Sequence, residues 1–486
     1  MRAHRITSRF AASGLALGLL VAGCARNPAT GQNELMLVSE SQEIQMGQAY
    51  DSQVVATIGL YPDPALQSYI QDIGKKLAAT SERPNLPWTF RVVDDPAVNA
   101  FAIPGGHVYV TRGILAHFTN EAELATVVGH EIGHVTARHT AAAMSKEQLA
   151  NLGLAIGSIA SSQVAKYAGV ATQALGVLFL KFSRDNENQA DELGVRYSSR
   201  ANYDSRQMLS VMQMLDKIES SSGGRLPEWL ATHPNPGNRI EHITAVIAQT
   251  KTDFSGAVVN RDSYVRRLDG IIFGMNPREG FFKGSEFYHP DLRFHMSFPS
   301  GWQTMNSKQA VAAQSPQQDA VIELSLAQGS NADQAARSFL SAQGMQAGTL
   351  TRSRVSGLTA SEAPFSANTA SGTVRGDAVF VEYGNNVYRL LAYSPDAQWS
   401  GYQGLAQRAL SSFGPLSDPS ILNMQPQHVS LFTLDRRTTI AELARQRPSP
   451  VSVATLALIN QVDDNTTLEP GRIVKWVVGQ QLPVTP

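Results

Sequence analysis

The chain has 486 residues, 43% hydrophobic and 17% charged, which excludes a collagen-like or wholly disordered protein and argues against a polytopic membrane protein. At about 150 residues per domain, this length allows about three domains. Lys and Arg total 40 and Asp and Glu 41, so the net charge of -1 provides no overall positive field to attract nucleic acid. A single cysteine excludes an intrachain disulfide and a multi-cysteine zinc site. A metal site would therefore need histidine and carboxylate ligands.

The first 24 residues have the pattern of a bacterial export signal: a basic head, an apolar stretch over 15 to 21, and small residues before Cys24. The apolar stretch is too short for a membrane-spanning helix. The ending Val-Ala-Gly-Cys resembles a lipoprotein signal, which implies lipidation of Cys24 and anchoring to the outer membrane, because Ala25 and not aspartate follows. The alternative is an ordinary secretory signal and a soluble periplasmic protein.

Helical spacing dominates the next part of the chain. Apolar residues recur at intervals of three and four over 40 to 50 and 65 to 77, and we expect 25 to 260 to be mainly helical. The apolar stretch 149 to 180 contains too many polar residues for a membrane span. It is interpreted as a pair of core helices, with a mobile lid or a membrane-surface element as the alternative.

The period changes to two beyond residue 285. Alternating strands near 292 to 298 and 322 to 326, a hairpin around Gly384, and helices at 333 to 343 and 402 to 413 predict a small α+β domain over 285 to 415. The sequence of this domain contains no metal-binding or nucleophile pattern that would indicate its role.

The last segment, 425 to 480, has the order strand, helix, helix, strand. The strands are expected at 429 to 434 and 472 to 478, and Thr439 and Glu442 fit a capping box at the first helix. The segment resembles a divergent LysM module, which implies peptidoglycan binding. Arg436-Arg437-Thr438 replaces the usual Gly-Asp-Thr turn.

The segment around residue 130 carries the strongest chemical signal, His-Glu-x-x-His in an apolar helical pattern. Spacing of four places His130 and His134 one turn apart on one helix face, where both imidazoles can bind one ion. Neutral imidazoles suit zinc, and Glu131, beside them, can take a proton from the attacking water.

A third ligand is expected downstream, in Ser183-Arg-Asp-Asn-Glu187-Asn-Gln-Ala-Asp191. Glu187 and Asp191 stand four apart, so Glu187 can bind the metal while Asp191 accepts the outer N–H of a ligand histidine. Glu192 and Asp185 are the rival assignments, on a different face of the helix.

These motifs together resemble the CAAX prenyl protease/HtpX-like zinc metallopeptidases, closest to the periplasmic type that enhances barrel assembly. The other matching motifs are Arg138-His139, Asn99-Ala-Phe-Ala-Ile-Pro104-Gly105-Gly106, and Thr232-His233-Pro234 with Arg239. The resemblance covers about residues 27 to 250. It implies one zinc per chain on His130, His134 and Glu187, with Glu131 as general base.

The resemblance also directs attention to two further features. His233 is expected either to stabilise the oxyanion, together with Arg239, or to occupy the open fourth metal position and hold the enzyme closed. Residues 107 to 111, which follow a Pro-Gly-Gly turn, are expected to form an edge strand that binds extended substrate, with contacts from Gly105, Gly106, Val108 and Val110. An ordinary interior strand is the alternative.

The expected architecture is multidomain: a signal over 1 to 24, a mainly α zincin-type metallopeptidase domain with a small active-site sheet over 25 to 260, the α+β domain, and the LysM-like module. We expect an endopeptidase of the bacterial envelope that cleaves unfolded or misassembled proteins. Expected partners are those polypeptides, the outer-membrane barrel-assembly machinery and peptidoglycan, with no nucleic acid and with membrane contact by lipid alone. The alternatives are a non-catalytic assembly chaperone or scaffold using the same strand, and a peptidoglycan hydrolase; an intact Glu131 favours the peptidase.

Overall fold

The computed structural model describes residues 24–154, 182–221, 229, 232–233, 236–369 and 372–481. The export signal before Cys24 and most of the predicted helix pair at 149 to 180 lie outside the described residues. The chain divides into two units, the first containing residues up to 273 and 429–477, the second containing 274–428 and 478–486. Among the described residues no helix is both long and apolar enough to cross a membrane.

The first unit is built mainly from helices. They are α2 (Glu40–Thr57), α3 (Pro64–Ala78), α4 (Arg112–His117), α5 (Glu121–Thr136), α6 (His139–Leu154), α8 (Arg184–Arg200), α9 (Gln207–Ser221), α11 (Pro236–Thr250), α12 (Arg261–Arg266), α16 (Ile440–Gln446) and α17 (Val453–Ile459). The predicted helices at 40 to 50 and 65 to 77 are confirmed as parts of α2 and α3. Their starts follow local capping, because the Ser39 hydroxyl accepts from Gln42 N and Asp63 accepts from Ala65 N and Leu66 N.

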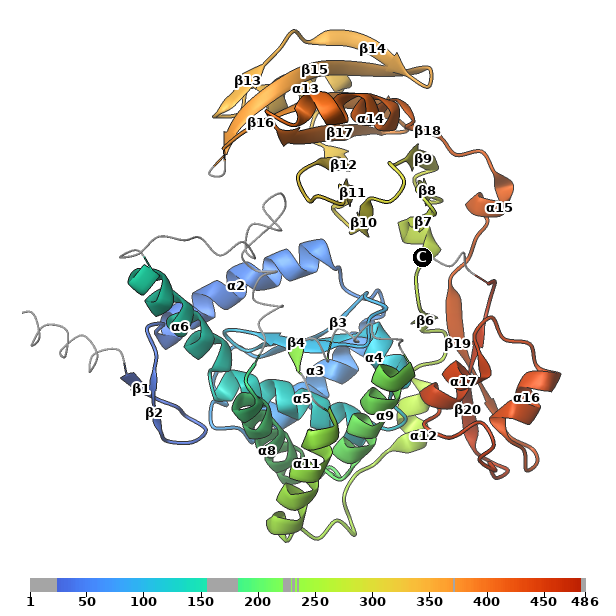
Figure 1. Cartoon of the computed structure of the whole chain (residues 1–486). Coiled ribbons are helices and arrows are strands. Elements are labelled where there is room, and N and C mark those ends of the chain that lie inside the picture. Colours follow the sequence, from blue (N-terminus) through green and yellow to red (C-terminus); the bar gives the residue numbers. More distant parts are fainter. Residues whose placement is uncertain are drawn as a thin grey trace, which may run out of the picture. The chain divides into compact units, whose positions relative to one another are not determined.

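A small mixed sheet lies beside α5. Its strands, in the order β3-β5-β4, are β3 (Thr89–Val93), β5 (His107–Thr111) and β4 (Ala100–Ile103). Figure 1 shows α5 between this sheet and α8, and α5 packs against both. Every residue of α5 is buried, so the helix that carries the metal-binding motif forms the centre of the unit.

The expectation that residues 107 to 111 form an edge strand is wrong. β5 is the central strand, parallel to β3 and antiparallel to β4, and all five of its residues are buried. Its polar side chains have protein partners instead of solvent: Tyr109 Oη donates to Asp51 Oδ1 at 2.6 Å, and His107 Nδ1 lies 2.8 Å from Thr89 Oγ1. Gly105, Gly106, Val108 and Val110 are likewise buried and cannot pair with a substrate backbone as an edge would.

The last segment of the chain belongs to the first unit. Strands β19 (Gln427–Thr433) and β20 (Ile473–Val478) form a three-stranded sheet with β6 (Ile272–Phe273), in the order β20-β19-β6. With α16 and α17 between them, the elements follow the predicted order, and the capping box of Thr439 and Glu442 is present. Val429 and Ile473 are in the same apolar core cluster as residues of α3, α5 and α9. Two further short strands, β1 (Cys24–Arg26) and β2 (Asn33–Leu35), pair near the start of the described chain.

The second unit contains two antiparallel sheets. The larger follows the order β10-β11-β12-β17-β16-β15-β13, with β14 also pairing β15; the smaller follows β18-β9-β8-β7. Their strands are β7 (Phe281–Lys283), β8 (Glu286–His289), β9 (Phe294–Ser297), β10 (Gln303–Asn306), β11 (Ala310–Gln314), β12 (Val321–Ala327), β13 (Met345–Ala347), β14 (Thr351–Val355), β15 (Leu358–Thr369), β16 (Gly372–Tyr383), β17 (Asn386–Pro395) and β18 (Gly414–Pro415). The predicted hairpin is confirmed as β16 and β17, with Tyr383 paired to Asn386.

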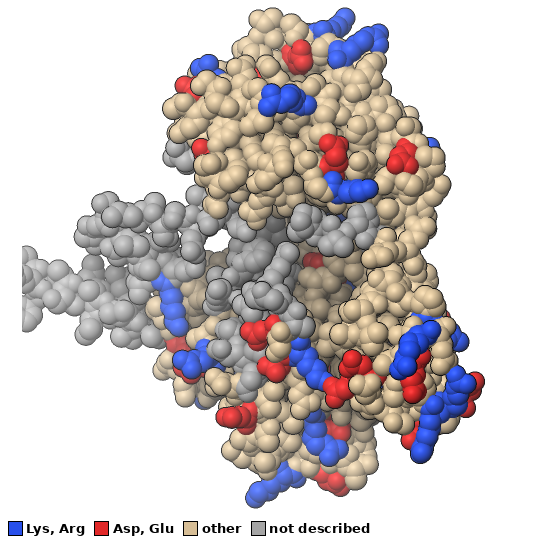
Figure 2. Space-filling model, turned by 45° about the vertical axis from the view of Figure 1, so that its right-hand side comes forward, with Lys and Arg blue, Asp and Glu red and all other residues tan. Residues whose placement is uncertain are grey.

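Helices α13 (Ala332–Leu340) and α14 (Trp399–Ser411) cover opposite faces of the larger sheet. Phe380 of β16 packs with residues of α13, whereas its neighbour Val379 packs with residues of α14, and successive strand residues point to opposite faces. Both helices match the predicted ones at 333 to 343 and 402 to 413. The short helices η2 (Pro277–Glu279) and α15 (Pro419–Leu422) complete the unit. On the face drawn in Figure 2, basic and acidic side chains are scattered over a mostly uncharged surface.

Candidate metal centre

Helix α5 presents the two histidines of the His-Glu-x-x-His motif on one face. Asn120 caps the helix by accepting from Glu123 N at 2.9 Å, which fixes where the helix begins and therefore which face the motif occupies. The Nε2 atoms of His130 and His134 lie 3.1 Å apart, and both side chains are buried. Two imidazole nitrogens thus converge on one point.

Helix α8 supplies the carboxylate. Glu187 Oε2 lies 3.8 Å from His130 Nε2, and Glu187 Oε1 lies 3.6 Å from His134 Nε2. The helices approach closely because they meet at glycines: a Cβ on Gly194 would lie 3.0 Å from the backbone nitrogen of His130. The predicted rivals do not enter the site, since Glu192 and Asp185 are exposed.

His233 joins this group from a separate segment. Ligand atoms of His130, His134, Glu187 and His233 all lie within 4.8 Å of one another, and all four residues are buried. His233 Nδ1 lies 2.9 Å from Glu187 Oε1, and its ring stacks on Trp229 at a centroid distance of 4.8 Å. The Nδ1 atom donates to the carboxylate, and although burial opposes charge on His233, Glu187 and Glu131 raise its pKa.

Arg239 and Asp191 contact the residues of this group through hydrogen bonds and ion pairs. The guanidinium Nε donates to Asp191 Oδ2 at 2.8 Å, and a second guanidinium nitrogen lies 3.0 Å from Glu187 Oε2. Asp191 Oδ1 also lies 2.9 Å from His130 Nδ1. The buried guanidinium of Arg239 thus faces two carboxylates, and its expected role at the oxyanion stays a prediction.

The charge states of these groups follow from burial and from their neighbours. Burial lowers the pKa of His134 well below its usual value, and the nearby histidines add to the effect. Burial opposes charge on Asp191, but Arg239 and His130 together outweigh it and lower the pKa to about 2. Burial raises the pKa of Glu131, against the opposing effect of His233 and His130. At neutral pH His134 is therefore a neutral imidazole, the form that binds metals.

His139, and through it Gln189, are linked to the predicted ligand His134, and the sequence assigned a role at the site to neither residue. His139 Nδ1 lies 2.9 Å from His134 Nδ1, and His139 Nε2 lies 2.7 Å from Gln189 Oε1. His139 belongs to the Arg138-His139 pair of the family-like motif, but Gln189 carries no signal beyond its place on the Glu187/Asp191 helix. Their proximity depends on how α5, α6 and α8 pack, which local spacing does not reveal.

The donor set suits zinc. Imidazole nitrogens and a carboxylate oxygen are the ligands of catalytic zinc sites, and buried groups of this kind pair or bind metal rather than remain isolated. Glu131 Oε1 is buried beside the group with no hydrogen-bond partner among the described residues, so it is available to a water or substrate.

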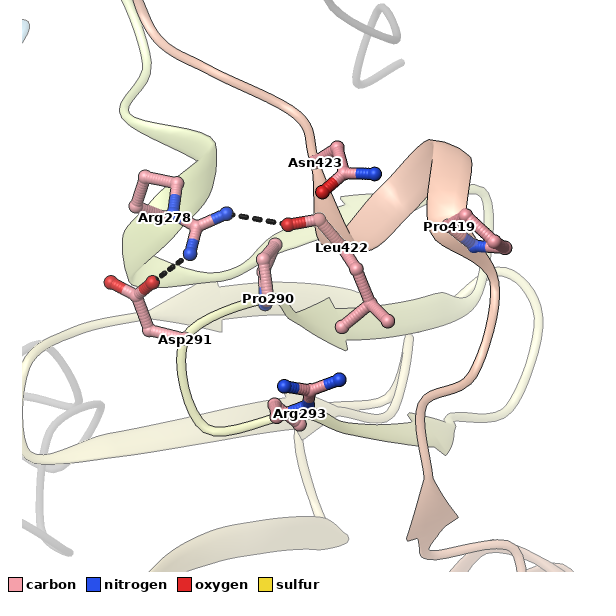
Figure 3. A pocket seen from close by; sticks show the side chains of 7 residues that line it. All are labelled: Arg278, Pro290, Asp291, Arg293, Pro419, Leu422 and Asn423. Carbon is pink, nitrogen blue, oxygen red and sulfur yellow. Dashed lines mark hydrogen bonds and ion pairs between the residues drawn. The ribbon is translucent and has the colours of Figure 1, made fainter.

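A pocket in the second unit has fewer groups that could bind or react with a ligand. It is lined by Arg278, Pro290, Asp291, Arg293, Pro419, Leu422 and Asn423 (Figure 3). Arg278 donates to Leu422 O at 2.6 Å and pairs with Asp291, as the dashed lines in Figure 3 indicate. The arginine is thus engaged in joining η2 to α15 rather than free for a ligand.

Comparison with known proteins finds relatives that match part of the chain. Over 245 residues the chain is 33% identical to the beta-barrel assembly-enhancing protease of Escherichia coli (strain K12), an alignment of 47% of this chain and 50% of that protein. It is 38% identical over 177 residues to the mitochondrial metalloendopeptidase OMA1 of Arabidopsis thaliana, covering 36% and 35%. The chain thus aligns with about half the length of the first of these relatives.

A solved structure, cyanobacterial PsbP from Synechocystis sp. PCC 6803, aligns with 28% of this chain and 94% of its own, at 12% identity and a TM-score of 0.24. That score is too low to indicate a shared fold. The family match is more informative: residues 64–247 fit Peptidase family M48, whose members are zinc metallopeptidases. This segment contains α5, α8, His233 and Arg239, so the region around the candidate metal centre is similar to Peptidase family M48.

Proposed function

We propose that the protein is a zinc-dependent endopeptidase of the bacterial cell envelope that cleaves unfolded or misassembled proteins. The observation that carries the proposal is the buried group of His130, His134 and Glu187, with Glu131 beside it, inside a segment that matches an M48 peptidase. In this proposal His130, His134 and Glu187 hold the ion, and Glu131 is the general base.

Bound zinc supplies Lewis acidity that activates water and polarises the scissile carbonyl. Glu131 accepts the proton of the attacking water at Oε1, the carboxylate oxygen that has no hydrogen-bond partner among the described residues. Burial raises the pKa of Glu131 toward neutral pH. A carboxyl with a pKa in that direction can both accept and release a proton during the reaction. Glu131 then delivers the proton to the leaving amine.

Asp191 and Arg239 act as positioning residues. Asp191 accepts from His130 Nδ1, which leaves Nε2 as the metal-binding atom. Arg239 neutralises part of the negative charge of Asp191 and Glu187 and holds both carboxylates in place. The predicted role of Arg239 in stabilising the oxyanion stays a prediction beside this positioning role.

Substrate pairing is assigned to β4 rather than β5. Thr111 N donates to Asn99 O, and main-chain pairs alternate along an antiparallel ladder, so the N–H and C=O groups of Ala102 point away from β5. β4 packs against α5 and has no strand neighbour other than β5 among the described residues. An extended polypeptide that adds to this edge would run beside the metal centre.

His233 is proposed to close the resting site. Its Nδ1–H···Glu187 contact turns the ring toward the other ligands, and its Nε2 lies 3.8 Å from Glu131 Oε1. An imidazole there competes with water for the open metal position. Such a latch limits cleavage in a compartment where unfolded client proteins are abundant.

The proposals about the location and the partners of the protein rest on its sequence and on the names of its relatives. Cys24, at the end of the export signal, is proposed to carry a lipid anchor to the outer membrane. The E. coli relative is named as an enhancer of barrel assembly, and unfolded outer-membrane proteins are the substrate class proposed from that name. Binding of peptidoglycan by the LysM-like segment remains a weaker proposal, because Arg436 and Arg437 occupy its expected turn.

The test is to incubate the purified mature chain with an outer-membrane barrel protein, either unfolded or already folded in detergent. We expect cleavage of the unfolded form only, abolished by a zinc chelator and restored by added zinc. Equal cleavage of both forms would contradict the selectivity for unfolded proteins. No cleavage of either form with zinc bound would favour an assembly chaperone.

A further inference from the structure

His139 contacts the outer nitrogen of one metal-ligand candidate, His134, and Gln189 contacts the other side of the His139 ring. His139 is the first residue of α6, and its side chain is buried. Gln189 lies on α8, between Glu187 and Asp191. They reach His134 as a chain of contacts: Gln189 Oε1 to His139 Nε2 at 2.7 Å, then His139 Nδ1 to His134 Nδ1 at 2.9 Å.

Hydrogen-bond chemistry gives this chain a direction. An amide oxygen only accepts, so the proton between Gln189 and His139 belongs to His139 Nε2. A neutral imidazole carries one proton, so His139 Nδ1 is then an acceptor and must receive a proton from His134 Nδ1. His134 Nε2 is left as a lone pair, and it is this atom that lies 3.1 Å from His130 Nε2 in the candidate metal centre.

We infer that Gln189 and His139 are positioning residues that set the tautomer of His134 for zinc binding, and the inference rests on the proposed zinc site. They do for His134 what Asp191 does for His130. The two histidines thereby receive different outer partners: a carboxylate for His130, and a neutral imidazole oriented by an amide for His134. Outer partners of this kind change metal affinity by about 10-fold to 100-fold when removed.

The test measures zinc affinity of the full mature chain by competition with a chromophoric chelator, so it does not depend on catalysis. Gln189→Met keeps the length of the side chain and removes the acceptor, and we expect about 10-fold weaker zinc binding. His139→Leu should weaken binding at least as much. The double variant should bind zinc no more weakly than His139→Leu alone, because Gln189 acts only through His139.

Two further variants keep the result interpretable. His139→Gln retains an oxygen that can accept from His134 Nδ1–H, so it should bind zinc more tightly than His139→Leu. Gln71→Met is the matched control, since it also removes an amide acceptor. Gln71 Oε1 accepts a hydrogen bond from Phe90 N at 2.8 Å, and this contact is not part of the metal centre. The control should lose thermal stability while keeping the zinc affinity of the wild type.

The outcomes separate the two proposals. If the wild type binds no zinc, the proposed function fails whatever the variants do. If the wild type binds zinc and Gln189→Met binds it within twofold as tightly, the tautomer chain is refuted and the metal site stands. A further drop in the double variant, or an equal drop in Gln71→Met, would also refute it.

Discussion

His233 is the residue whose role is most open to direct test. It lies against both Glu187 and Glu131, so it can either close the metal position or assist the reaction. As a latch, it should hold back activity, and His233→Ala should raise cleavage of an unfolded protein by about tenfold if the site is open about a tenth of the time. Zinc content, measured in the same samples, should stay near one per chain.

A decrease of about 100-fold in His233→Ala with zinc retained would instead indicate that His233 stabilises the transition state. Unchanged activity would leave it as a structural residue held by Glu187 and the ring of Trp229. The latch is contradicted by either result.

The edge of β4 is the element on which substrate binding depends. Proline at 102 would remove an outward N–H without removing a ladder bond to β5, because the N–H of Ala102 does not face that strand. We expect Ala102→Pro to raise KM for a peptide substrate about threefold to tenfold, the value of one main-chain hydrogen bond, with little change in kcat. A fall in kcat at constant KM would contradict binding at this edge.

Strand β20 is joined to the peptidase helices by a buried lysine. Lys475 Nζ donates to Ala116 O at 2.7 Å and Phe118 O at 2.6 Å, at the carboxyl end of α4. Burial lowers its pKa to about 7, although Glu123 opposes the shift. The lysine is therefore largely neutral in the folded protein above that pH but still charged in the unfolded chain.

This difference predicts a pH-dependent stability. Between pH 7 and about 10.5 unfolding takes up a proton at Lys475, so raising the pH favours the folded state by up to ~1.4 kcal/mol per pH unit. The wild type should gain stability relative to Lys475→Met as the pH rises from 7 to 9.5. Denaturation midpoints of both proteins at several pH values measure this; a constant difference between them would contradict the buried neutral lysine.

At the scale of the whole molecule, the first unit is formed from both ends of the chain. Val429 N donates to Ile271 O at 2.9 Å, and Gly270 N donates to Val429 O at 2.8 Å, so residues before and after the second unit are adjacent. We predict that replacing residues 274 to 428 with a short Gly/Ser linker leaves a folded protein that binds zinc.

A chain that stops before residue 429 should behave differently. It lacks Val429 and Ile473, which are 0% and 2% exposed in the main core cluster, and it should melt at a clearly lower temperature. Thermal unfolding and zinc content of the two shortened proteins test the prediction. Equal stability of the truncated chain would show that the C-terminal segment is not needed by the peptidase unit.

Sequence patterns predicted the parts of the site that lie within single helices. The spacing of His130 and His134, and that of Glu187 and Asp191, depends only on helical geometry, and each pair does lie on one face. The segment from Val429 to Val478 was likewise predicted element by element.

What failed or was missed depends on neighbours distant in sequence. Residues 107 to 111 were expected to form an edge strand, but β5 is the central strand of its sheet, and Tyr109 donates to Asp51, a residue distant in sequence. Nothing local marks Gln189 as a partner of His139, or Lys475 as a buried donor to α4. Such contacts are decided by the packing of whole elements, which periodicity does not encode.

The central claim is that Glu131 performs zinc-dependent peptide cleavage, and one paired measurement tests it most directly. Zinc content and the rate of cleavage of an unfolded protein are determined on the same preparations of wild type and Glu131→Gln. The account predicts about one zinc per chain in both proteins and a cleavage rate at least ~100-fold lower in the variant, because the amide cannot accept the water proton. Wild-type cleavage by a zinc-loaded Glu131→Gln protein, or a wild type that cleaves without zinc, would contradict it.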